Sequence, residues 1–509
     1  MDARFDAFCS SLALSAPQVK CLKDEIAESA TGPHSHGSGL ELACRAAEMA
    51  LGPDRVDTSP LNNIVAHKTW SQACTASPYC IIQPASAADV TKAIRIFRHF
   101  DVHFAVRSGG HSPNPGASSI DANGILLDLQ HMNAISLSQD KSIASLGPGG
   151  RWGDVLEALT PQGVDVVGGR IPVVGVSGLI LGGGLHHLMA ELGTAADNVD
   201  NFEVVLADGT VVSANAKEND DLFWALKGGG PNFGVVTRFD VHAIPARKIW
   251  YEMRVYAVDD LAAVLDAHAT WQNSGASDTK STASLIMTPD AITAVLQYSA
   301  PVERPEAFAP FYNLEPLQLA VPSTIGTFQS LATILGSVTP NQPMRHDYRA
   351  TSSRIDARLY EDVYRFWRTR ALAVRDETGA NQTFVIQPVV PNVAKQGIAR
   401  EATQWVSQRR IIFMGVPKGW TTLIDWTDPK DDEKVRSVSI ETTEQWKKLG
   451  QERSLHIPFL FMNDASRDQN SLATYGVGNI ARLKEISLKY DPTQLFQKRQ
   501  NGGFLLSKV

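Results

Sequence analysis

The chain has 509 residues, more than a single hydrophobic core usually covers, so we expect two or more folding units. Its composition is that of an ordinary globular protein, and its formal net charge of −7 leaves no basic excess to neutralise phosphates, which argues against a protein that binds a polyanion such as nucleic acid. No apolar run reaches the roughly 18 residues of a membrane span. The nearest run, residues 171–185, is rich in glycine and predicts a buried, tightly turned segment.

The first 60 residues predict helices with a flexible interruption at residues 31–39. They lack the basic region and long apolar run of a signal peptide, so we expect either a cytoplasmic protein or a mature secreted form. All five cysteines lie within the first 80 residues, at irregular spacing and without a Cys-x-x-Cys pair. This pattern disfavours a zinc site and a full disulfide framework, and it favours buried free thiols for most of them.

Alternating helix and strand patterns follow. A capping box at Ser86 and Asp89 predicts the start of a helix that runs to Phe100, with apolar residues at helical spacing. The helix leads into a strand at residues 104–106, which ends in a double-glycine turn that carries His111. Further elements are expected as short strands at 125–129, 134–137 and 143–146 and a helix at 152–159.

The next segment, up to Pro245, predicts a hairpin, a helix and a strand. Residues 203–212 alternate about Asp208-Gly209, a dipeptide that favours a tight turn with positive φ. A helix at 220–227 ends on three glycines, and a strand at 235–241 follows it.

From about residue 246 to 454 glycine becomes rarer, and aromatic and β-branched runs alternate with helical stretches such as 357–373. Three runs predict strands, at 383–390, 410–416 and 421–426. We therefore expect a separate antiparallel sheet covered by helices, which makes the fold class α+β. The last 50 residues add a helix at 480–489 that stops at Asp491-Pro492.

Five glycine clusters gather between residues 109 and 234, at 109–110, 147–150, 168–169, 175–184 and 228–234. Glycine permits close backbone approach and positive φ, and the N–H groups of such loops can form concavities that hold phosphates. The clusters can equally be tight structural turns, and the pattern alone leaves both interpretations open. Neither G-x-G-x-x-G nor G-x-x-x-x-G-K-[ST] occurs, which disfavours a Rossmann or P-loop site.

Several motifs occur in a fixed order: AVRSGGHSPNPG (105–116), LGPGGRWGDVLEAL (146–159), RIPVVGVSGLILGGGL (170–185), ADNV (196–199), the Asp-Gly hairpin, DLFWALKGGGPNFGVVT (221–237) and the tail NDAS…YG…KYDPTQLF (463–496). Together they resemble the fungal berberine-bridge-enzyme-like FAD-linked oxidases of the vanillyl-alcohol oxidase superfamily, over residues 40–245 and 455–509. The resemblance implies an N-terminal helical segment (1–60), a two-subdomain PCMH-type FAD-binding domain (61–245), a substrate-binding domain (246–454) and a C-terminal segment (455–509) that returns to the FAD-binding domain.

The resemblance also implies roles for individual residues around FAD. His111 corresponds to the histidine that bonds covalently to the 8α-methyl group of the flavin in this family. Ile171 stands where some relatives carry a second tether, a cysteine, so a single covalent link is predicted. Val174 stands where the family controls oxygen access, and valine there accompanies oxidase behaviour. The other predicted FAD contacts are Ser108, Gly109, Gly110, Gly175, Ser177, Gly178, Gly183, Asp197, Asn198, Val235 and Asn463.

The implied function is oxidation of a small organic substrate of secondary metabolism, with hydride transfer to flavin N5 and reoxidation by O2 to give H2O2. Two alternatives stay open: a flavin dehydrogenase, and a non-redox cyclase or pericyclase that uses the same pocket. The catalytic base is not identified, because the neutral Gln387 stands near the position where plant relatives often carry a glutamate, and a tyrosine or a histidine is an alternative. His186 and His187 are adjacent and do not face one ligand together, so no metal site is predicted.

The resemblance also supports a disulfide between Cys44 and Cys80, because secreted fungal relatives carry cysteines in the two matching stretches. An intracellular location would weaken that expectation. The expected partners are a small-molecule substrate and O2, with neither nucleic acid nor membrane. We expect the chain to be a monomer or a homodimer.

Overall fold

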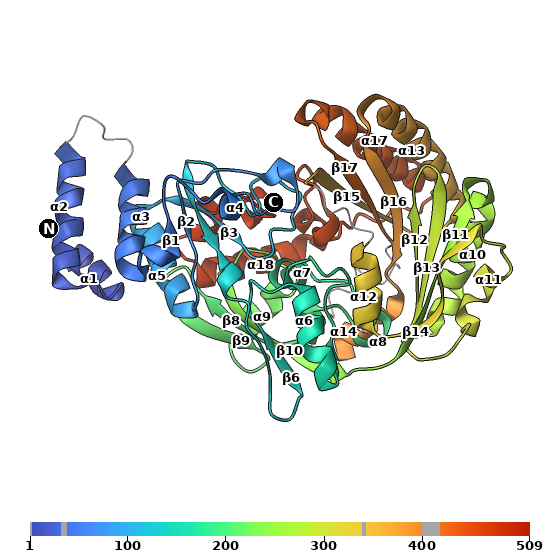
Figure 1. Ribbon diagram of the computed structural model, residues 1–509, viewed down its shortest axis with the longest axis horizontal. Coiled ribbons are helices and arrows are strands. Elements are labelled where there is room, and N and C mark those ends of the chain that lie inside the picture. Colours follow the sequence, from blue (N-terminus) through green and yellow to red (C-terminus); the bar gives the residue numbers. More distant parts are fainter. Residues whose placement is uncertain (1–2, 32–37, 338–342, 400–417) are drawn as a thin grey trace.

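Three β-sheets organise the molecule (Figure 1). A computed structural model describes residues 3–31, 38–337, 343–399 and 418–509. Two smaller sheets are built from residues before 246, and one large antiparallel sheet is built from residues 249–426. The α+β class expected from the sequence is confirmed, with the two smaller sheets in the first part of the chain and the helix-covered sheet in the second.

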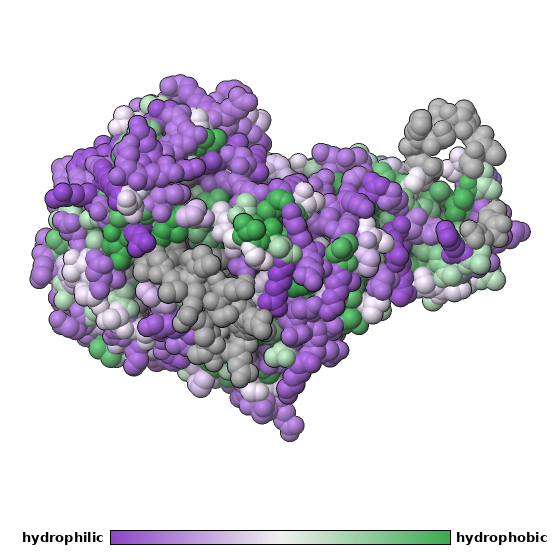
Figure 2. Space-filling view, turned by 180° about the vertical axis from the view of Figure 1, so that it is seen from behind, coloured by the Kyte–Doolittle hydropathy of each residue, from purple (hydrophilic) through white to green (hydrophobic). Residues whose placement is uncertain are grey.

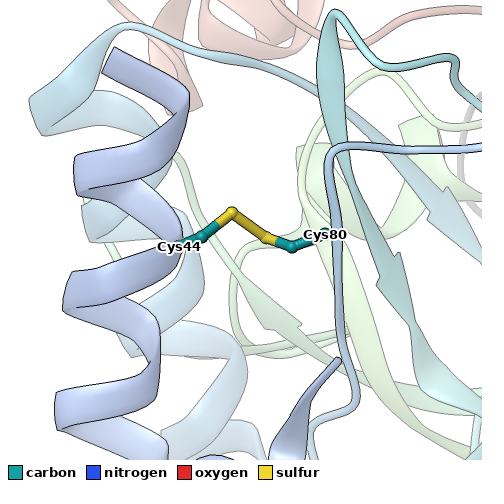
Figure 3. Close-up of a disulfide and its surroundings, with 2 residues drawn as sticks. All are labelled: Cys44 and Cys80. Atoms are coloured by element: carbon teal, nitrogen blue, oxygen red, sulfur yellow. A yellow bond between two sulfur atoms is a disulfide. The ribbon is translucent and has the colours of Figure 1, made fainter. Parts of the chain in front are cut away.

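Three helices lie at the end of the molecule opposite the large sheet (Figure 1): α1 (Ala3–Ser11), α2 (Ala16–Thr31) and α3 (Ser38–Leu51). They confirm the helical prediction for the N-terminal segment, while most of the predicted interruption falls outside the described residues. A disulfide joins Cys44 on α3 to Cys80 on strand β2 (Cys80–Ile82), with the two Cα atoms 6.5 Å apart (Figure 3). The pairing implied by the family resemblance is therefore present, and it fixes the helical segment to the first sheet.

Removing this disulfide is expected to destabilise the protein by about 2–4 kcal/mol, because the bond closes a long loop and restricts the unfolded chain. The two cysteines are 36 residues apart and both are buried. Urea unfolding of the double variant Cys44→Ala/Cys80→Ala measures the loss, and Cys21→Ala, which removes a cysteine outside the bridge, is the control. Reductant should lower the stability of the wild type by a similar amount and leave the double variant unchanged. An equal effect of reductant on both proteins would contradict the bridge.

The first sheet has the order β1-β2-β4-β3, in which β2, β4 and β3 run parallel. Its remaining strands are β1 (Val56–Asp57), β3 (His103–Arg107) and β4 (Gly124–Asp128), with the short helix α4 (Asn63–Ala66) before β2. Helix α5 (Ala87–Phe100) begins at the predicted capping box: Asp89 N donates to Ser86 Oγ at 3.2 Å, and Ala85 N donates to the Asp89 carboxylate at 3.0 Å. The helix packs its apolar face on the sheet, which orients the chain into β3 and the loop beyond it.

The second sheet has the order β5-β6-β10-β8-β9, and β7 also pairs with β10. Residues 203–212 form the predicted hairpin, with Gly209 at a φ of 81° and Leu206 N donating to Thr210 O at 2.9 Å. The segment between β7 and β8 carries two of the five glycine clusters, at residues 168–169 and 175–184. The strands are β5 (Ile135–Leu137), β6 (Ile143–Leu146), β7 (Val164–Val166), β8 (Val199–Val205), β9 (Val211–Asn215) and β10 (Val235–Pro245), and the helices are α6 (Trp152–Leu159), α7 (Val176–Leu181), α8 (Met189–Leu192) and α9 (Asp220–Leu226).

The third sheet is antiparallel throughout, with the order β14-β11-β13-β12-β16-β17-β15. Its strands are β11 (Ile249–Ala257), β12 (Ser281–Met287), β13 (Ala291–Tyr298), β14 (Gln318–Gly326), β15 (Arg345–Ser353), β16 (Asn381–Pro388) and β17 (Lys418–Trp426). The strands predicted at 383–390 and 421–426 are β16 and β17, and the one predicted at 410–416 lies outside the described residues.

Helices cover one face of this sheet (Figure 1). They are α10 (Leu261–Asn273), α11 (Ala309–Tyr312), α13 (Ala357–Thr378) and α17 (Asp432–Glu452), while α12 (Phe328–Ser337) and α14 (Pro391–Ala399) lie towards the second sheet. Phe384 of β16 packs between Trp367 of α13 and Trp446 of α17, with ring centroids 5.4 and 5.7 Å from its own. All three rings are buried, so this aromatic layer holds the helices on the sheet.

The C-terminal segment returns to the first two sheets and holds the strand that leads to His111. Phe104 N donates to Arg499 O at 3.0 Å, and Asn501 N donates to Phe104 O at 2.8 Å, so β3 is paired on its second side as well. Asn232 Nδ2 donates to Phe504 O at 2.8 Å. The segment contains α18 (Val477–Tyr490), which includes the predicted helix, and α19 (Leu495–Lys498).

The face turned away from the viewer in Figure 1 is mostly hydrophilic, with hydrophobic patches gathered towards its middle (Figure 2). Among the described helices, none combines the length and the apolar character that crossing a bilayer requires. The bulkiest aromatic side chains are buried; one described core cluster joins the second and third sheets, and another joins the N-terminal helices to the first sheet.

Candidate functional site

A cavity of about 370 Å³ lies where five parts of the chain meet: the loop after β3, the segment around α7, the segment that leads into β10, strand β15 and the C-terminal segment. This size is typical of a site for a small molecule or part of a cofactor. Glycines and apolar side chains make up most of the wall, and a few polar side chains converge on it. The polar and ionisable lining residues include Ser108, His111, Arg170, Ser177, Tyr348, Asn463 and Asp464.

The loop that carries His111 touches the loop before α7 by backbone alone. A β-carbon on Gly109 would lie 2.4 Å from Gly175 Cα, and one on Gly175 would lie 2.6 Å from Gly109 Cα. Only glycine at both positions permits this contact. Gly110 then takes a φ of 63°, a conformation that favours glycine, and His111 follows in the cavity wall.

A third glycine-rich segment joins these two loops. The hydroxyl groups of Ser108 and Ser177 both donate to the carbonyl oxygen of Pro148, the latter at 3.0 Å. A β-carbon on Gly149 would lie 2.1 Å from Leu129 O, so this segment also needs glycine for a close approach. These three glycine clusters are therefore tight contacts between segments, and two of them, at 109–110 and 175–184, also line the cavity.

The imidazole of His111 is the end of a stack of three rings. It lies on Trp70 with centroids 4.3 Å apart, and Trp70 lies on His346 of β15 with centroids 3.9 Å apart. His346 Nδ1 is hydrogen-bonded to a carboxylate oxygen of Asp425 at 2.5 Å, which fixes the far end of the stack. Burial, together with the positive charge of Arg151, lowers the pKa of His111 to about 3. His111 is therefore neutral at physiological pH, with its ring held in one plane.

Asn463 connects the C-terminal segment to the loop at α7. Its Nδ2 donates to Gly178 O at 2.8 Å, and Gly184 N donates to its Oδ1 at 3.3 Å. A β-carbon on Gly182 would lie 2.4 Å from Asn463 Nδ2, so glycine there leaves room for the amide. The asparagine predicted from the tail motif thus lies at the cavity, held by two backbone contacts of the α7 loop.

A carboxylate that the sequence analysis did not single out lies next to Asn463. Asp464 lines the cavity, and Gln387 Nε2 of β16 donates to its Oδ2 at 3.2 Å. Arg170 donates in turn to Gln387 Oε1. Burial raises the pKa of Asp464 to about 6, while the Arg170 charge and the Gln387 hydrogen bond act in the opposite direction. The available signal was its place directly after Asn463 in the tail motif.

The cavity brings together ten of the thirteen residues predicted to contact FAD: Ser108, Gly109, Gly110, His111, Val174, Gly175, Ser177, Gly178, Val235 and Asn463. The other three lie outside its lining. Gly183 takes a φ of 112° between two lining glycines. The Asp197 carboxylate accepts hydrogen bonds from Thr194 N and Oγ1 at 2.9 and 2.8 Å, and Asn198 Nδ2 donates to Thr194 O at 2.8 Å. These two side chains bond to the turn before β8.

A position at which the sequence departs from some of its relatives also lines the cavity. Ile171 presents an alkyl side chain where a second tether would require a thiol. His186 and His187 are buried outside the lining, where both rings approach Phe328, at centroid distances of 5.1 and 6.2 Å. Burial lowers the pKa of both rings, so both are neutral.

Comparison with known proteins agrees with this geometry. Residues 78–215 match a protein family described as FAD binding domain. The chain is 37% identical to an FAD-dependent monooxygenase of Arthrobotrys oligospora over 86% of its own length and 84% of that protein. It is 32% identical to the bifunctional solanapyrone synthase of Alternaria solani, over 93% and 91% of the two chains.

The fold is similar to that of a glucooligosaccharide oxidase from Acremonium strictum with a 6-S-cysteinyl, 8α-N1-histidyl FAD. The TM-score is 0.74 at 18% identity, over 86% of this chain and 95% of that one. Sequence relatives and fold thus agree with the motifs around the cavity. The chain belongs to the fungal family of FAD-dependent oxidoreductases that contains these relatives, and it has the fold of berberine-bridge-enzyme-like and related FAD oxidases.

Proposed function

We propose that this protein is an FAD-dependent oxidase of a small organic substrate of secondary metabolism, and that His111 alone holds FAD covalently. The observation that carries the proposal is the neutral imidazole of His111 in the wall of a glycine-lined cavity. A neutral ring nitrogen has a free lone pair, which the formation of a bond to a flavin methyl group requires. We infer that residues 61–245 and 455–509 bind FAD and that residues 246–454 bind the substrate.

The residues around the cavity fit FAD in shape and chemistry. The contact between Gly109 and Gly175 leaves backbone, without side chains, where a pyrophosphate has to approach closely. Gly110, Ser108 and Ser177 border the same space. The apolar part of the wall suits the flat face of an isoalloxazine ring.

When bound, FAD would accept a hydride from a substrate C–H bond and pass the electrons to O2, which gives H2O2. The chain supplies the surroundings for this chemistry. Ile171 offers no thiol for a second tether, and Val174 keeps a small side chain on the cavity wall. Tyr348 and Phe461 narrow the cavity on the side of the large sheet and the C-terminal segment.

Anaerobic mixing with benzyl and cinnamyl alcohol tests the proposal, because both carry an activated C–H next to O–H. The flavin absorbance should bleach, and air should restore it with one H2O2 released for each O2 consumed. Monooxygenation is the second candidate for the reaction, because the chain is similar to FAD-dependent monooxygenases. A monooxygenase would place 18O from 18O2 in the product and release little H2O2. Turnover of a polyene substrate without bleaching of the flavin would instead support a non-redox cyclase.

Replacing Val174 by leucine is expected to slow reoxidation of the reduced flavin by O2 by roughly tenfold, which corresponds to about 1.4 kcal/mol in the barrier. The added methylene fills space in the wall at the position that controls oxygen access in related oxidases. Stopped-flow mixing of reduced enzyme with O2 measures this rate. The neighbouring Val173→Leu is the matched control, because Val173 is 41% exposed and does not line the cavity. Equal effects of both substitutions would contradict the role of Val174.

A further inference from the structure

One partly buried carboxyl group in the cavity, that of Asp464, has an arrangement that suits proton transfer. Asp464 closes the short helical turn Met462–Asp464, and the neighbouring Asn463 fixes this turn to the α7 loop through hydrogen bonds to Gly178 and Gly184. Asp464 therefore reaches the cavity on a segment anchored from both sides. The position of Asp464 is therefore set by hydrogen bonds within the protein.

The hydrogen bonds around Asp464 leave one of its oxygens available. Arg170 donates to Gln387 Oε1, and this contact turns the Gln387 amide nitrogen towards Asp464 Oδ2, to which it donates at 3.2 Å. Within the described part of the chain, Oδ1 accepts no hydrogen bond. A carboxylate with one oxygen held and the other open to the cavity can accept a proton from a bound molecule.

The charges around Asp464 suit a base that works near neutral pH. Burial raises its pKa to about 6, and the Arg170 charge and the Gln387 hydrogen bond limit this rise. The described groups that face it are Arg170 from the segment before α7, Gln387 from β16 and Tyr348 from β15. Burial and the charges of Asp464 and Asp425 raise the pKa of Tyr348, so its phenol stays protonated and is the poorer base.

We propose that Asp464 is the catalytic base of the oxidation, and that Gln387 and Arg170 are positioning residues that hold its carboxylate. The inference rests on the proposed function. In the oxidation of an alcohol, the O–H proton moves to Asp464 Oδ1 and the C–H hydrogen leaves with its electron pair to the oxidant that FAD provides, so a C=O bond forms. The two electrons reach O2 together with the transferred hydrogen and the proton that Asp464 releases, and O2 becomes H2O2. Asp464 thus takes the place of the carboxylate that the neutral Gln387 does not supply.

The first test needs no substrate: a pH titration of the absorbance of bound FAD. The wild type is expected to show a transition near pH 6, and Asp464→Asn is expected to lose it. Gln387→Leu should move the midpoint to higher pH, because the hydrogen bond that stabilises the charged form is removed. Asp165→Asn is the matched control: burial also raises the pKa of Asp165, but it lies on β7 outside the cavity lining. A transition that persists unchanged in Asp464→Asn would overturn the proposal.

The second test is anaerobic flavin reduction by benzyl and cinnamyl alcohol between pH 5 and 8. In the wild type the rate should rise through the same transition, and in Asp464→Asn it should fall by about 100-fold or more and lose its pH dependence. Dithionite should reduce the flavin of both proteins equally, which shows that the cofactor is intact. If the flavin of Asp464→Asn is reduced as fast as that of the wild type, Asp464 is not the catalytic base, and the proposed oxidase function is unaffected. If neither alcohol reduces the wild type, the oxidation and its base both fail for alcohols.

Discussion

Replacing His111 by alanine is expected to abolish the covalent attachment of FAD while the fold is retained. In the wild type, denatured protein should carry yellow, fluorescent flavin through acid precipitation and gel electrophoresis, and in His111→Ala this fluorescence should vanish. The physical reason is that His111 is the only histidine in the cavity lining of the described chain, and its ring is neutral. Ile171 has no atom that could form a second bond to the flavin.

The ring stack makes this prediction more specific. Trp70 keeps the His111 imidazole in one plane, and His346 with Asp425 supports Trp70 from the other side. His67→Ala is the matched control, because His67 lies close in sequence to Trp70 but is exposed and outside the cavity lining. Flavin fluorescence that remains on the denatured His111→Ala chain would contradict the single attachment, and its loss from His67→Ala would contradict the specificity.

Local patterns were enough to predict elements whose stabilising contacts lie close in sequence. The cap at Ser86 bonds to a residue three positions away, and the Asp208-Gly209 turn closes a hairpin within a few residues. The resemblance of the ordered motifs to a known family was enough to predict that His111 and Asn463 contact one ligand, and both line one cavity. The cap, the turn and the motifs each depend on a few residues close in sequence, so they can be recognised in a single sequence.

Asp464 could not be identified in this way, because its chemistry depends on contacts between distant segments. Arg170 and Gln387 are 217 positions apart, and Gln387 and Asp464 are 77 apart. No local pattern indicates that an arginine turns an amide towards a carboxylate, or that burial then changes the pKa of that carboxyl. For Asp197 the motif predicted a contact with FAD. Its carboxylate instead accepts hydrogen bonds from Thr194, and it lies outside the cavity lining.

The strand that carries the His111 loop ends in a buried ion pair. Arg107 of β3 lies 2.6 Å from the Asp128 carboxylate at the end of β4, and the two side chains are only 2% and 1% exposed. The guanidinium also donates to the backbone carbonyls of Val65 and Ala66, at 2.6 and 3.0 Å. A β-carbon on Gly110 would lie 3.4 Å from Arg107 Cδ, so the loop packs directly against this arginine. The pair therefore connects α4, the first sheet and the cavity wall.

Arg107→Leu is accordingly expected to lower the free energy of unfolding by about 3–5 kcal/mol, because it leaves the Asp128 carboxylate buried without a counter-charge. The Val65 and Ala66 carbonyls lose their donor as well, and the loop before His111 loses its support, so less flavin should be attached. Urea unfolding of Arg107→Leu, Asp128→Leu and the double variant measures the coupling, and the double variant should be less destabilised than the sum of the two single ones. The exposed pair of Arg365 and Glu361 is the control, for which Arg365→Leu should cost less than about 1 kcal/mol. Equal losses for Arg107→Leu and Arg365→Leu would show that burial of the ion pair does not stabilise the loop.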